Sequence, residues 1–261
     1  MRRSRKIRKV VKIEPKSINQ PSMIVQGQVI KRNTVKKVKA GTQIVRQNRS
    51  SVPTKNQKNF KKVEPIWAGE TVYLIGGGPS LKGFEWNRLK GKKTIAINKA
   101  VKFYPNADAM YWTDGRVYSW LNKEINDFKG LKYTIRWNRN HTPDINVLKR
   151  GAKFGLETAK DTLAHGNNSG YAAINLAIHL GAKRIVLLGY DMGNDGKVSH
   201  FHDGYPVPAT ATNIYTKQFL PGFDILKDRL KGKDIQIYNA CPTSKLNTFK
   251  KITIDEALSF R

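Results

Sequence analysis

Residues 71–81 read TVYLIGGGPSL, and this stretch decides the fold that we expect for the chain. Its first five residues have the apolar, strand-favouring character of a short buried strand. The three glycines that follow let the backbone turn sharply and approach a ligand closely. Pro79 suits the first position of a helix, with Ser80 in the first turn. Such a junction directs N–H groups and a positive helix end at one point, which suits a phosphate; a tight turn without a ligand explains the glycines equally well.

Short apolar runs bounded by turn residues recur along the rest of the chain and alternate with helical patterns. This alternation predicts a doubly wound α/β fold with a mostly parallel, Rossmann-like sheet. A Gly at position 181 predicts the end of the clearest helix. The expected strands are 71–75, 93–97, 109–112, 132–136, 184–188 and 234–238, and the clearest helices are 171–180 and 216–230.

Polar residues follow most of these strands directly. Asn98 follows 93–97, Asp114 follows 109–112, and Asp191 follows 184–188 by three residues. In doubly wound sheets, ligands bind beyond the carboxyl ends of the strands, so these side chains are candidates to hold a nucleotide. Strands also end in turn residues without any ligand, and that alternative remains open.

A second candidate segment, GNNSG at 166–170, precedes the helix expected from Tyr171. Asn168 or Ser169 suits the N-cap of that helix, and capping alone explains both residues. The functional alternative is a second helix N-terminus aimed at an anion, with Gly170 allowing close approach of a ligand.

A third segment, SHFHDGYP at 199–206, holds two histidines two positions apart. His200 and His202 are candidate general bases because imidazole titrates near neutral pH, and Asp203 offers an acidic partner. The same three side chains also suit a metal, but no distant further ligand is evident, so we predict no metal site. An incidental surface loop is the remaining alternative. We expect His200, His202 and Asp191 to be the catalytic residues.

The charge is concentrated in residues 1–62, which hold 19 Lys and Arg against one acid, for a net charge of +18 out of +29. We interpret this segment as an extended or partly ordered basic arm, and residues 63–261 as the α/β domain. The arm predicts a polyanionic partner, with DNA or RNA ahead of an anionic membrane; a solvated tail is the alternative. The single cysteine, Cys241, fits a reducing, cytoplasmic compartment.

Four segments together resemble a known group of proteins: GGGPSL at 76–81, NSGYAAI at 168–174, LGAKRIVLLGYDM at 180–192 and CPTSKLNTF at 241–249. They are similar to the bacterial sialyltransferases that decorate lipooligosaccharide. They also resemble the related domain family that includes 6-hydroxymethylpterin diphosphokinase, of which phage genomes carry versions. The resemblance covers about residues 70–258 and leaves the basic arm unexplained.

This resemblance implies a role for each matching motif. Gly78, Pro79 and Ser80 would contact the phosphate and sugar of a nucleotide donor, and Asn98 would lie near the donor. The implied roles of the other motifs concern the donor sugar and base: Ser169 and Gly170 would hold the donor, and Pro242 and Ser244 would lie around a cytidine. The full set expected to bind the nucleotide is Gly76, Gly77, Gly78, Pro79, Ser80, Asn98, Asp114, Asn168, Ser169, Gly170, Pro242 and Ser244.

The chain also departs from the sialyltransferase pattern. The family places an arginine three positions before the Ser-Gly pair, where this chain has Gly166. The family tyrosines that assist phosphate departure align near Gly193 and Ser199, neither of which is a tyrosine. These departures argue against sialic acid as the donor sugar.

The leading interpretation is therefore a nucleotide-dependent transferase, a glycosyltransferase with a nucleotide-sugar donor that resembles the CMP-linked kind. Transfer would be an inverting displacement assisted by a histidine base. One alternative is a pyrophosphokinase of the hydroxymethylpterin type, which would need ATP and Mg²⁺ with Asp114 and Asp191 as candidate ligands. Another is a non-enzymatic, basic phage virion or nucleic-acid-associated protein that retains the fold. Under the phage interpretation the protein acts in the host cytoplasm or the virion.

Overall fold

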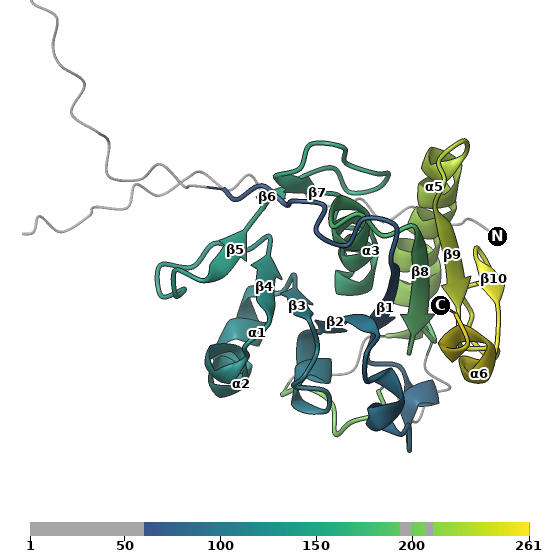
Figure 1. Cartoon of the computed structure of the whole chain (residues 1–261), viewed down its shortest axis with the longest axis horizontal. Coiled ribbons are helices and arrows are strands. Elements are labelled where there is room, and N and C mark those ends of the chain that lie inside the picture. The colour runs from purple at the N-terminus through teal and green to yellow at the C-terminus, as the bar shows by residue number, and fades with distance from the viewer. Residues whose placement is uncertain (1–59, 194–199, 207–210, 261) are drawn as a thin grey trace, which may run out of the picture. The chain divides into compact units, whose positions relative to one another are not determined.

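The structure, a computed structural model, describes residues 60–193, 200–206 and 211–260. Its centre is an eight-stranded sheet in the order β10-β9-β8-β1-β2-β3-β4-β5, and every neighbouring pair is parallel (Figure 1). The strands are β1 (Thr71–Ile75), β2 (Lys93–Ile97), β3 (Ala109–Trp112), β4 (Leu131–Thr134), β5 (Ile145–Val147), β8 (Arg184–Leu188), β9 (Gln236–Asn239) and β10 (Lys250–Lys251). A separate parallel pair is formed by β6 (Lys149–Arg150) and β7 (Thr162–Leu163).

Helices cover both faces of the sheet (Figure 1). The α-helices are α1 (Gly115–Trp120), α2 (Asn122–Asp127), α3 (Ser169–His179), α4 (Thr212–Ile214), α5 (Leu220–Leu230) and α6 (Ile254–Leu258). Short 3-10 helices follow β1 and β2: η1 (Pro79–Leu81), η2 (Trp86–Leu89) and η3 (Asn98–Lys102), and a π-helical turn, η4 (Tyr215–Phe219), leads into α5. Among the described residues, no helix is both long and apolar enough to cross a bilayer.

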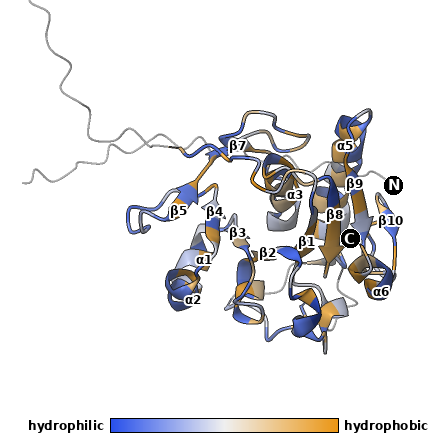
Figure 2. Cartoon of the chain, viewed as in Figure 1, coloured by the Kyte–Doolittle hydropathy of each residue, from blue (hydrophilic) through white to orange (hydrophobic). Residues whose placement is uncertain are grey.

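The central strands β1, β2, β3 and β8 are buried along most of their length, and β8 is coloured hydrophobic in Figure 2. Successive side chains of β1 enter two different cores. Val72 and Leu74 of β1 pack with α3 and α5, whereas Tyr73 and Ile75 pack with α1, α2 and α6. This alternation follows from the two-residue period of a strand. It explains why the sequence shows continuous apolar runs rather than alternating ones.

The predicted fold class is confirmed: the sheet is parallel, helices flank it, and β1 lies inside it between β8 and β2. Four strands have the predicted bounds, 71–75, 93–97, 109–112 and 184–188, and the other two, 132–136 and 234–238, are displaced by one or two residues. β5, β6, β7 and β10 were not predicted, because two or three residues carry no recognisable period.

The helix predicted over 216–230 is divided in the structure. Pro221 occupies the first turn of α5, and η4 precedes it as a π-helical turn. Proline lacks an N–H and its ring crowds the carbonyl four residues earlier, so a widened turn before it accommodates the ring.

Most of the predicted basic arm lies outside the described residues, so its binding role and the domain boundary stay predictions. Residues 60–62 are described and contact the domain. The Lys61 N–H donates to the Val147 carbonyl at 3.0 Å, beside the edge strand β5, and Phe60 packs against a hydrophobic core cluster.

Candidate functional site

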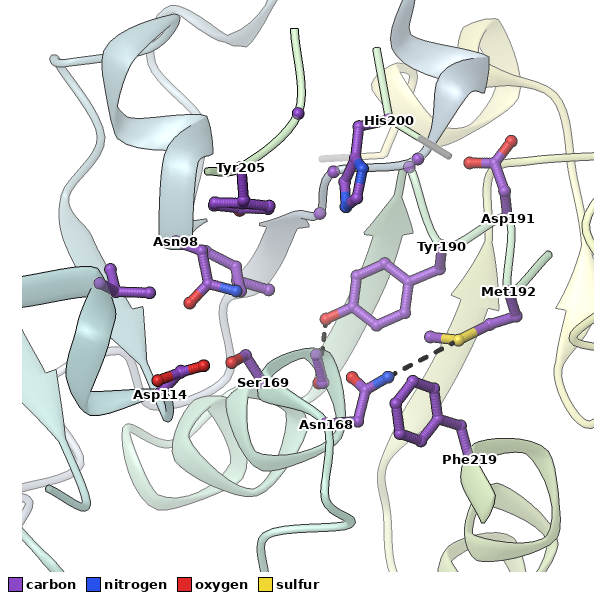
Figure 3. A pocket seen from close by; sticks show the side chains of 18 of the residues that line it. Asn98, Asp114, Asn168, Ser169, Tyr190, Asp191, Met192, His200, Tyr205 and Phe219 are labelled. Carbon is purple, nitrogen blue, oxygen red and sulfur yellow. Dashed lines mark hydrogen bonds between the residues drawn. The ribbon is translucent and has the colours of Figure 1, made fainter. Parts of the chain in front are cut away.

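A pocket of about 470 Å³ opens beyond the carboxyl ends of β1, β2, β3 and β8 (Figure 3). The chain order reverses at this place: β2 to β5 extend to one side of β1, and β8 to β10 extend to the other. β1 and β8 thus form the switch point of the sheet, and the pocket lies beyond it, at the place where doubly wound folds bind their ligands.

The glycine loop, residues 76–78, is held against the exit of β8. The N–H groups of Gly76 and Gly78 donate to the carbonyls of Leu188 and Gly189, each at 2.8 Å. A Cβ on Gly78 would lie 1.8 Å from the Asp191 Oδ2, so only glycine fits there. The loop therefore needs glycine because its backbone lies close to the residues that follow β8.

Asp191 stabilises the start of η1. Its carboxylate accepts hydrogen bonds from the Ser80 N–H at 3.0 Å and from the Ser80 hydroxyl at 2.8 Å. Two N–H groups of the loop and that of Ser80 are therefore engaged within the protein. Gly77 is the one glycine of the loop whose N–H makes no hydrogen bond to the described residues.

The N-terminus of α3 forms another wall of the pocket. Asn168 is the N-cap, and its side-chain oxygen accepts from the Tyr171 N–H at 3.1 Å. Ser169 and Gly170 occupy the first turn, and both line the pocket. The Tyr190 hydroxyl donates to the Gly170 carbonyl at 3.0 Å, which fixes this turn against the β8 exit. The first-turn N–H groups thus face the same space as the glycine loop, an arrangement that favours an anion.

Among the described residues, three that are not glycine have a positive φ: Asn98 at 52°, Asn167 at 51° and Met192 at 51°. Asn98 and Met192 line the pocket, and Asn167 directly precedes the N-cap of α3. Such backbone conformations cost free energy and collect at functional sites. Asn98 carries a second cost, because its buried side-chain oxygen has no hydrogen-bond partner among the described residues. Asn98 follows β2 and faces the pocket (Figure 3).

The histidine loop, residues 200–206, lies across the glycine loop. The Phe201 N–H donates to the Gly77 carbonyl at 3.0 Å, and a Cβ on Gly77 would lie 3.0 Å from the His200 ring. Lys99 anchors the far side of the loop: its ammonium binds Asp203 and donates to the Gly204 carbonyl at 2.6 Å. The acidic residue next to the histidines is therefore paired with a lysine.

His200 and His202 differ in their position relative to the pocket and in how far their pKa values are lowered. His200 lines the pocket, and burial with the nearby Lys99 charge lowers its pKa from the ordinary value. His202 lies behind it, with its ring 4.8 Å from the His200 ring, and its Nδ1 accepts from the Gly204 N–H. Burial, together with His200 and Lys99, lowers the pKa of His202 to about 4. His200 is thus the better placed candidate base.

Asp114 begins α1 and is bound to Arg116. Its carboxylate accepts from the Arg116 N–H at 2.9 Å and pairs with the guanidinium at 2.6 Å. These hydrogen bonds hold the pKa of Asp114 below its ordinary value. Asp114 and Asp191, the candidate Mg²⁺ ligands, therefore both have protein partners, and the described residues contain no cluster of three or more His, Cys, Asp or Glu that suits a metal.

Aromatic rings supply the remaining walls of the pocket. Trp120 of α1 and Tyr205 lie 5.7 Å apart between ring centroids, and Phe219 of η4 lies on the side near Asn168 (Figure 3). Burial raises the pKa of Tyr205 to about 12, so its hydroxyl stays protonated at neutral pH. Flat apolar rings beside a helix N-terminus suit a ligand that carries both a ring and an anion.

The structure brings most of the predicted site residues into one pocket. Those that line it are Gly76, Gly77, Gly78, Asn98, Asp114, Asn168, Ser169, Gly170, Asp191 and His200. Those that do not line it are Pro79, Ser80, His202, Pro242 and Ser244. Ser80 and His202 bond to loop residues beside the pocket. Ser244 is buried, and its hydroxyl donates to the Tyr190 carbonyl at 2.6 Å, so it supports the β8 exit from behind.

Several pocket residues were not predicted from the sequence: Arg116, Trp120, Tyr190, Met192, Tyr205, Tyr215 and Phe219. Tyr190 and Met192 flank a predicted residue, Asp191, so their position after the strand was a usable signal. Trp120 and Phe219 lie inside helices, where an aromatic residue usually indicates core packing, and no local pattern distinguishes them.

Comparisons with known proteins give one solved structure to report. No protein-family model matches the chain, and no curated protein sequence does. The sialyltransferase CstII from Campylobacter jejuni, described in complex with a substrate analogue, cytidine-5′-monophosphate, is similar over 74% of this chain and 89% of its own. The identity is 18% and the TM-score 0.46, and no conclusion about activity follows from a likeness at that level.

Proposed function

We propose that the chain is a glycosyltransferase that transfers a sugar from a nucleotide-sugar donor to an acceptor hydroxyl. The observation that carries this proposal is the backbone conformation of Asn98 together with the burial of its side-chain oxygen. Asn98 combines a φ of 52° with a buried side-chain oxygen that has no hydrogen-bond partner among the described residues, and the residue lines the pocket at the switch point of the sheet. Both features cost stability, and a ligand that donates a hydrogen bond to this oxygen would repay part of that cost.

The residues that line the pocket favour one orientation of a bound nucleotide. The donor phosphate would lie at the N-terminus of α3, near Ser169 and Gly170, where N–H donors and the helix dipole favour negative charge. The base or sugar ring would lie against Trp120, Tyr205 or Phe219. A CMP-linked donor is the form that the sequence motifs resemble.

The residue three positions before Ser169 is Gly166, so the α3 terminus lacks an arginine there. Lys245 is a cation beside the pocket: a Cβ on Gly193, which lines the pocket, would lie 3.3 Å from its ammonium. We assign to Lys245 a role in neutralising the departing nucleotide phosphate, because developing anionic charge is stabilised by cations held in place.

Transfer would follow from the position of His200. Its neutral imidazole accepts the proton of the acceptor hydroxyl while the acceptor oxygen forms a bond to the anomeric carbon. The bond from that carbon to the donor phosphate oxygen breaks, and the nucleotide leaves with the electron pair. Attack opposite to the leaving group inverts the anomeric configuration. Asp191 acts as a positioning residue in this scheme, because its carboxylate is bonded to Ser80.

The proposal is tested by titrating the full-length protein with CMP, UDP, GDP and ATP, each with and without Mg²⁺. A ligand that binds the native state raises the Tm, by the equivalent of about 2.7 kcal/mol when its concentration is 100 times Kd. We expect one nucleoside mono- or diphosphate to raise the Tm, and the Asn98→Ala variant to lose most of that increase. Donor hydrolysis or transfer is then measured with the sugar-linked form of that nucleotide.

Two outcomes would overturn the proposal. An increase with ATP alone that requires Mg²⁺ would favour a pyrophosphokinase. No response to any nucleotide, in a protein that unfolds cooperatively, would favour a non-enzymatic protein that retains the fold.

A further inference from the structure

Four exposed cations lie on segments next to the pocket. We define the cationic rim as Arg136, Arg139, Arg150 and Lys153. All four side chains are exposed, and none forms an ion pair within the described residues. The nearby acids have partners of their own: Asp114 pairs with Arg116, Asp144 with Lys132 and Asp161 with Lys149, and the Glu157 carboxylate accepts from the Ala152 N–H at 2.7 Å. Asp114 also interacts with the Arg136 charge.

The rim is joined to the pocket by hydrogen bonds. The Arg136 Nε donates to the Thr113 carbonyl at 3.1 Å, and the Thr113 N–H donates to the Ser169 hydroxyl at 3.3 Å. On the other side of the rim, the Gly166 N–H donates to the Lys153 carbonyl at 2.6 Å, directly before α3. Arg136, Arg150 and Lys153 all contribute to lowering the pKa of His165, which lies between these two contacts, so their charges converge there.

The loop between β4 and β5 presents an aromatic ring beside these cations. Trp137 exposes 52% of its surface, which is unusual for a large apolar side chain. The loop is held in place from α1: the Tyr118 hydroxyl donates to the Asn140 carbonyl at 2.7 Å, and its ring packs on His141 at 4.6 Å. Because Val117 and Trp120 of α1 line the pocket, the loop that carries Trp137 adjoins the pocket mouth.

We propose that the cationic rim and Trp137 bind single-stranded nucleic acid. Guanidinium groups bind phosphate in a fork, and an exposed aromatic ring beside them stacks on an unpaired base, which together form the usual platform for single strands. A duplex offers no unpaired base to Trp137. The bound nucleic acid would present a hydroxyl to the pocket as the acceptor of the transferred sugar. Its role as acceptor rests on the proposed transferase function, whereas its binding to the rim does not.

The test measures binding of a fluorescent single-stranded oligonucleotide, as DNA and as RNA, to the full-length protein from about 50 to 200 mM salt. We expect Arg139→Glu to weaken binding at least tenfold and to reduce the slope of log K against log salt, since a phosphate contact is lost. Trp137→Ala should weaken binding about fivefold or more without changing that slope, because stacking carries no charge.

A matched control removes equal charge elsewhere. Lys90 lies three residues before β2 and Lys129 two residues before β4, at the amino ends of these strands and so at the opposite edge of the sheet, and both are exposed. The Lys90→Ala/Lys129→Ala protein should bind nearly as the wild type does, and it is compared with Arg136→Ala/Arg139→Ala. The Tm of each variant confirms that it is folded, and Trp137→Phe, which keeps an aromatic face, should retain most of the affinity.

Equal losses in the rim and control variants would overturn the proposal, since any positive charge would then serve. A second result would also overturn the proposal: duplex DNA or heparin binds with the same affinity as the single-stranded oligonucleotide, and Arg139→Glu weakens that binding equally. The rim would then be a general surface for polyanions. Nucleotide binding is measured separately, so a protein that binds the strand without binding a nucleotide would refute the transferase proposal and leave the rim proposal standing.

Discussion

The Asp191 carboxylate accepts two hydrogen bonds from Ser80, one from the N–H at 3.0 Å and one from the hydroxyl at 2.8 Å. These residues lie 111 positions apart in the chain and join the exits of two neighbouring strands, β1 and β8. Asp191 lines the pocket, so the conformation of the glycine loop there depends on a residue from the other half of the sheet.

Replacing Asp191 tests whether its role is to position the loop. Asp191→Ala should lower the free energy of unfolding by about 1.5–3 kcal/mol, because hydrogen bonds to a charged group are lost. Asp191→Asn should lose less, since an amide accepts from the Ser80 N–H and donates to its hydroxyl. Urea denaturation gives the stability, and transfer assays give the activity. Stable Asp191→Asn protein with no turnover would instead assign a direct chemical role to the charge.

A methyl group on Gly78 should displace Asp191. Its Cβ would lie 1.8 Å from Oδ2 of that carboxylate and 2.6 Å from the Gly189 carbonyl. We expect Gly78→Ala to destabilise the protein by about 1–3 kcal/mol, as overpacking does, and to weaken nucleotide binding. Gly115→Ala is the matched control, because no atom lies within 4 Å of its Cβ. Its Tm should be unchanged or slightly raised. Similar Tm values for both variants would contradict the predicted clash.

Replacing Asn98 and Asn167, which both have a positive φ, tests whether the backbone strain at Asn98 serves ligand binding. Asn98→Gly should raise the Tm by about 2–4 °C, since glycine adopts a positive φ without strain and the unpartnered oxygen is removed. It should also weaken nucleotide binding. Asn167 has nearly the same φ, is exposed and does not line the pocket, so Asn167→Gly should raise the Tm and leave nucleotide affinity unchanged. Unchanged affinity in Asn98→Gly would remove the main support for the proposed site.

Substitutions of His200 and of His202 should have different effects on the rate of transfer. His200→Ala should reduce kcat by a factor of about 10²–10⁴ with little change in nucleotide affinity, as the loss of a general base does. Because the pKa of His200 is lowered, the acid limb of the kcat/KM profile should fall below the ordinary histidine range of about 6.5. His202→Asn should keep measurable transfer. Equal loss of binding and turnover in His200→Ala would make His200 a binding residue.

Protonation of His202 should destabilise the fold in mild acid. Its pKa is about 4 in the folded protein and about 6.5 when unfolded, so the unfolded chain binds more protons between these values. The free energy of unfolding should therefore fall as the pH falls from about 6.5 to about 4. His202→Asn keeps an acceptor for the Gly204 N–H and should flatten this dependence. Parallel Tm profiles of both proteins across that range would contradict the assignment.

Much of the architecture was readable from the sequence because it depends on local patterns. The bounds of β1, β2, β3 and β8 follow from four- or five-residue apolar runs that end at turn residues. Such runs indicate strands covered on both faces, and the helical periods between them require parallel crossovers. The carboxyl ends of parallel strands share one edge of the sheet, so Asn98, Ser169 and Asp191 were expected at a common site before their contacts were known.

The sequence by itself thus determined the sheet type, the edge of the sheet at which the pocket opens, and ten of the residues that line this pocket. Only the tertiary structure decided what those residues do there, because hydrogen bonds between distant segments leave no local pattern. It engages the N–H groups of Gly76 and Gly78 with the β8 exit, pairs Asp191 with Ser80, and places His202 behind His200. It also gathers Trp120, Tyr205 and Phe219 into one wall from three separate elements. Close packing brought these side chains together, and no spacing along the chain encodes it.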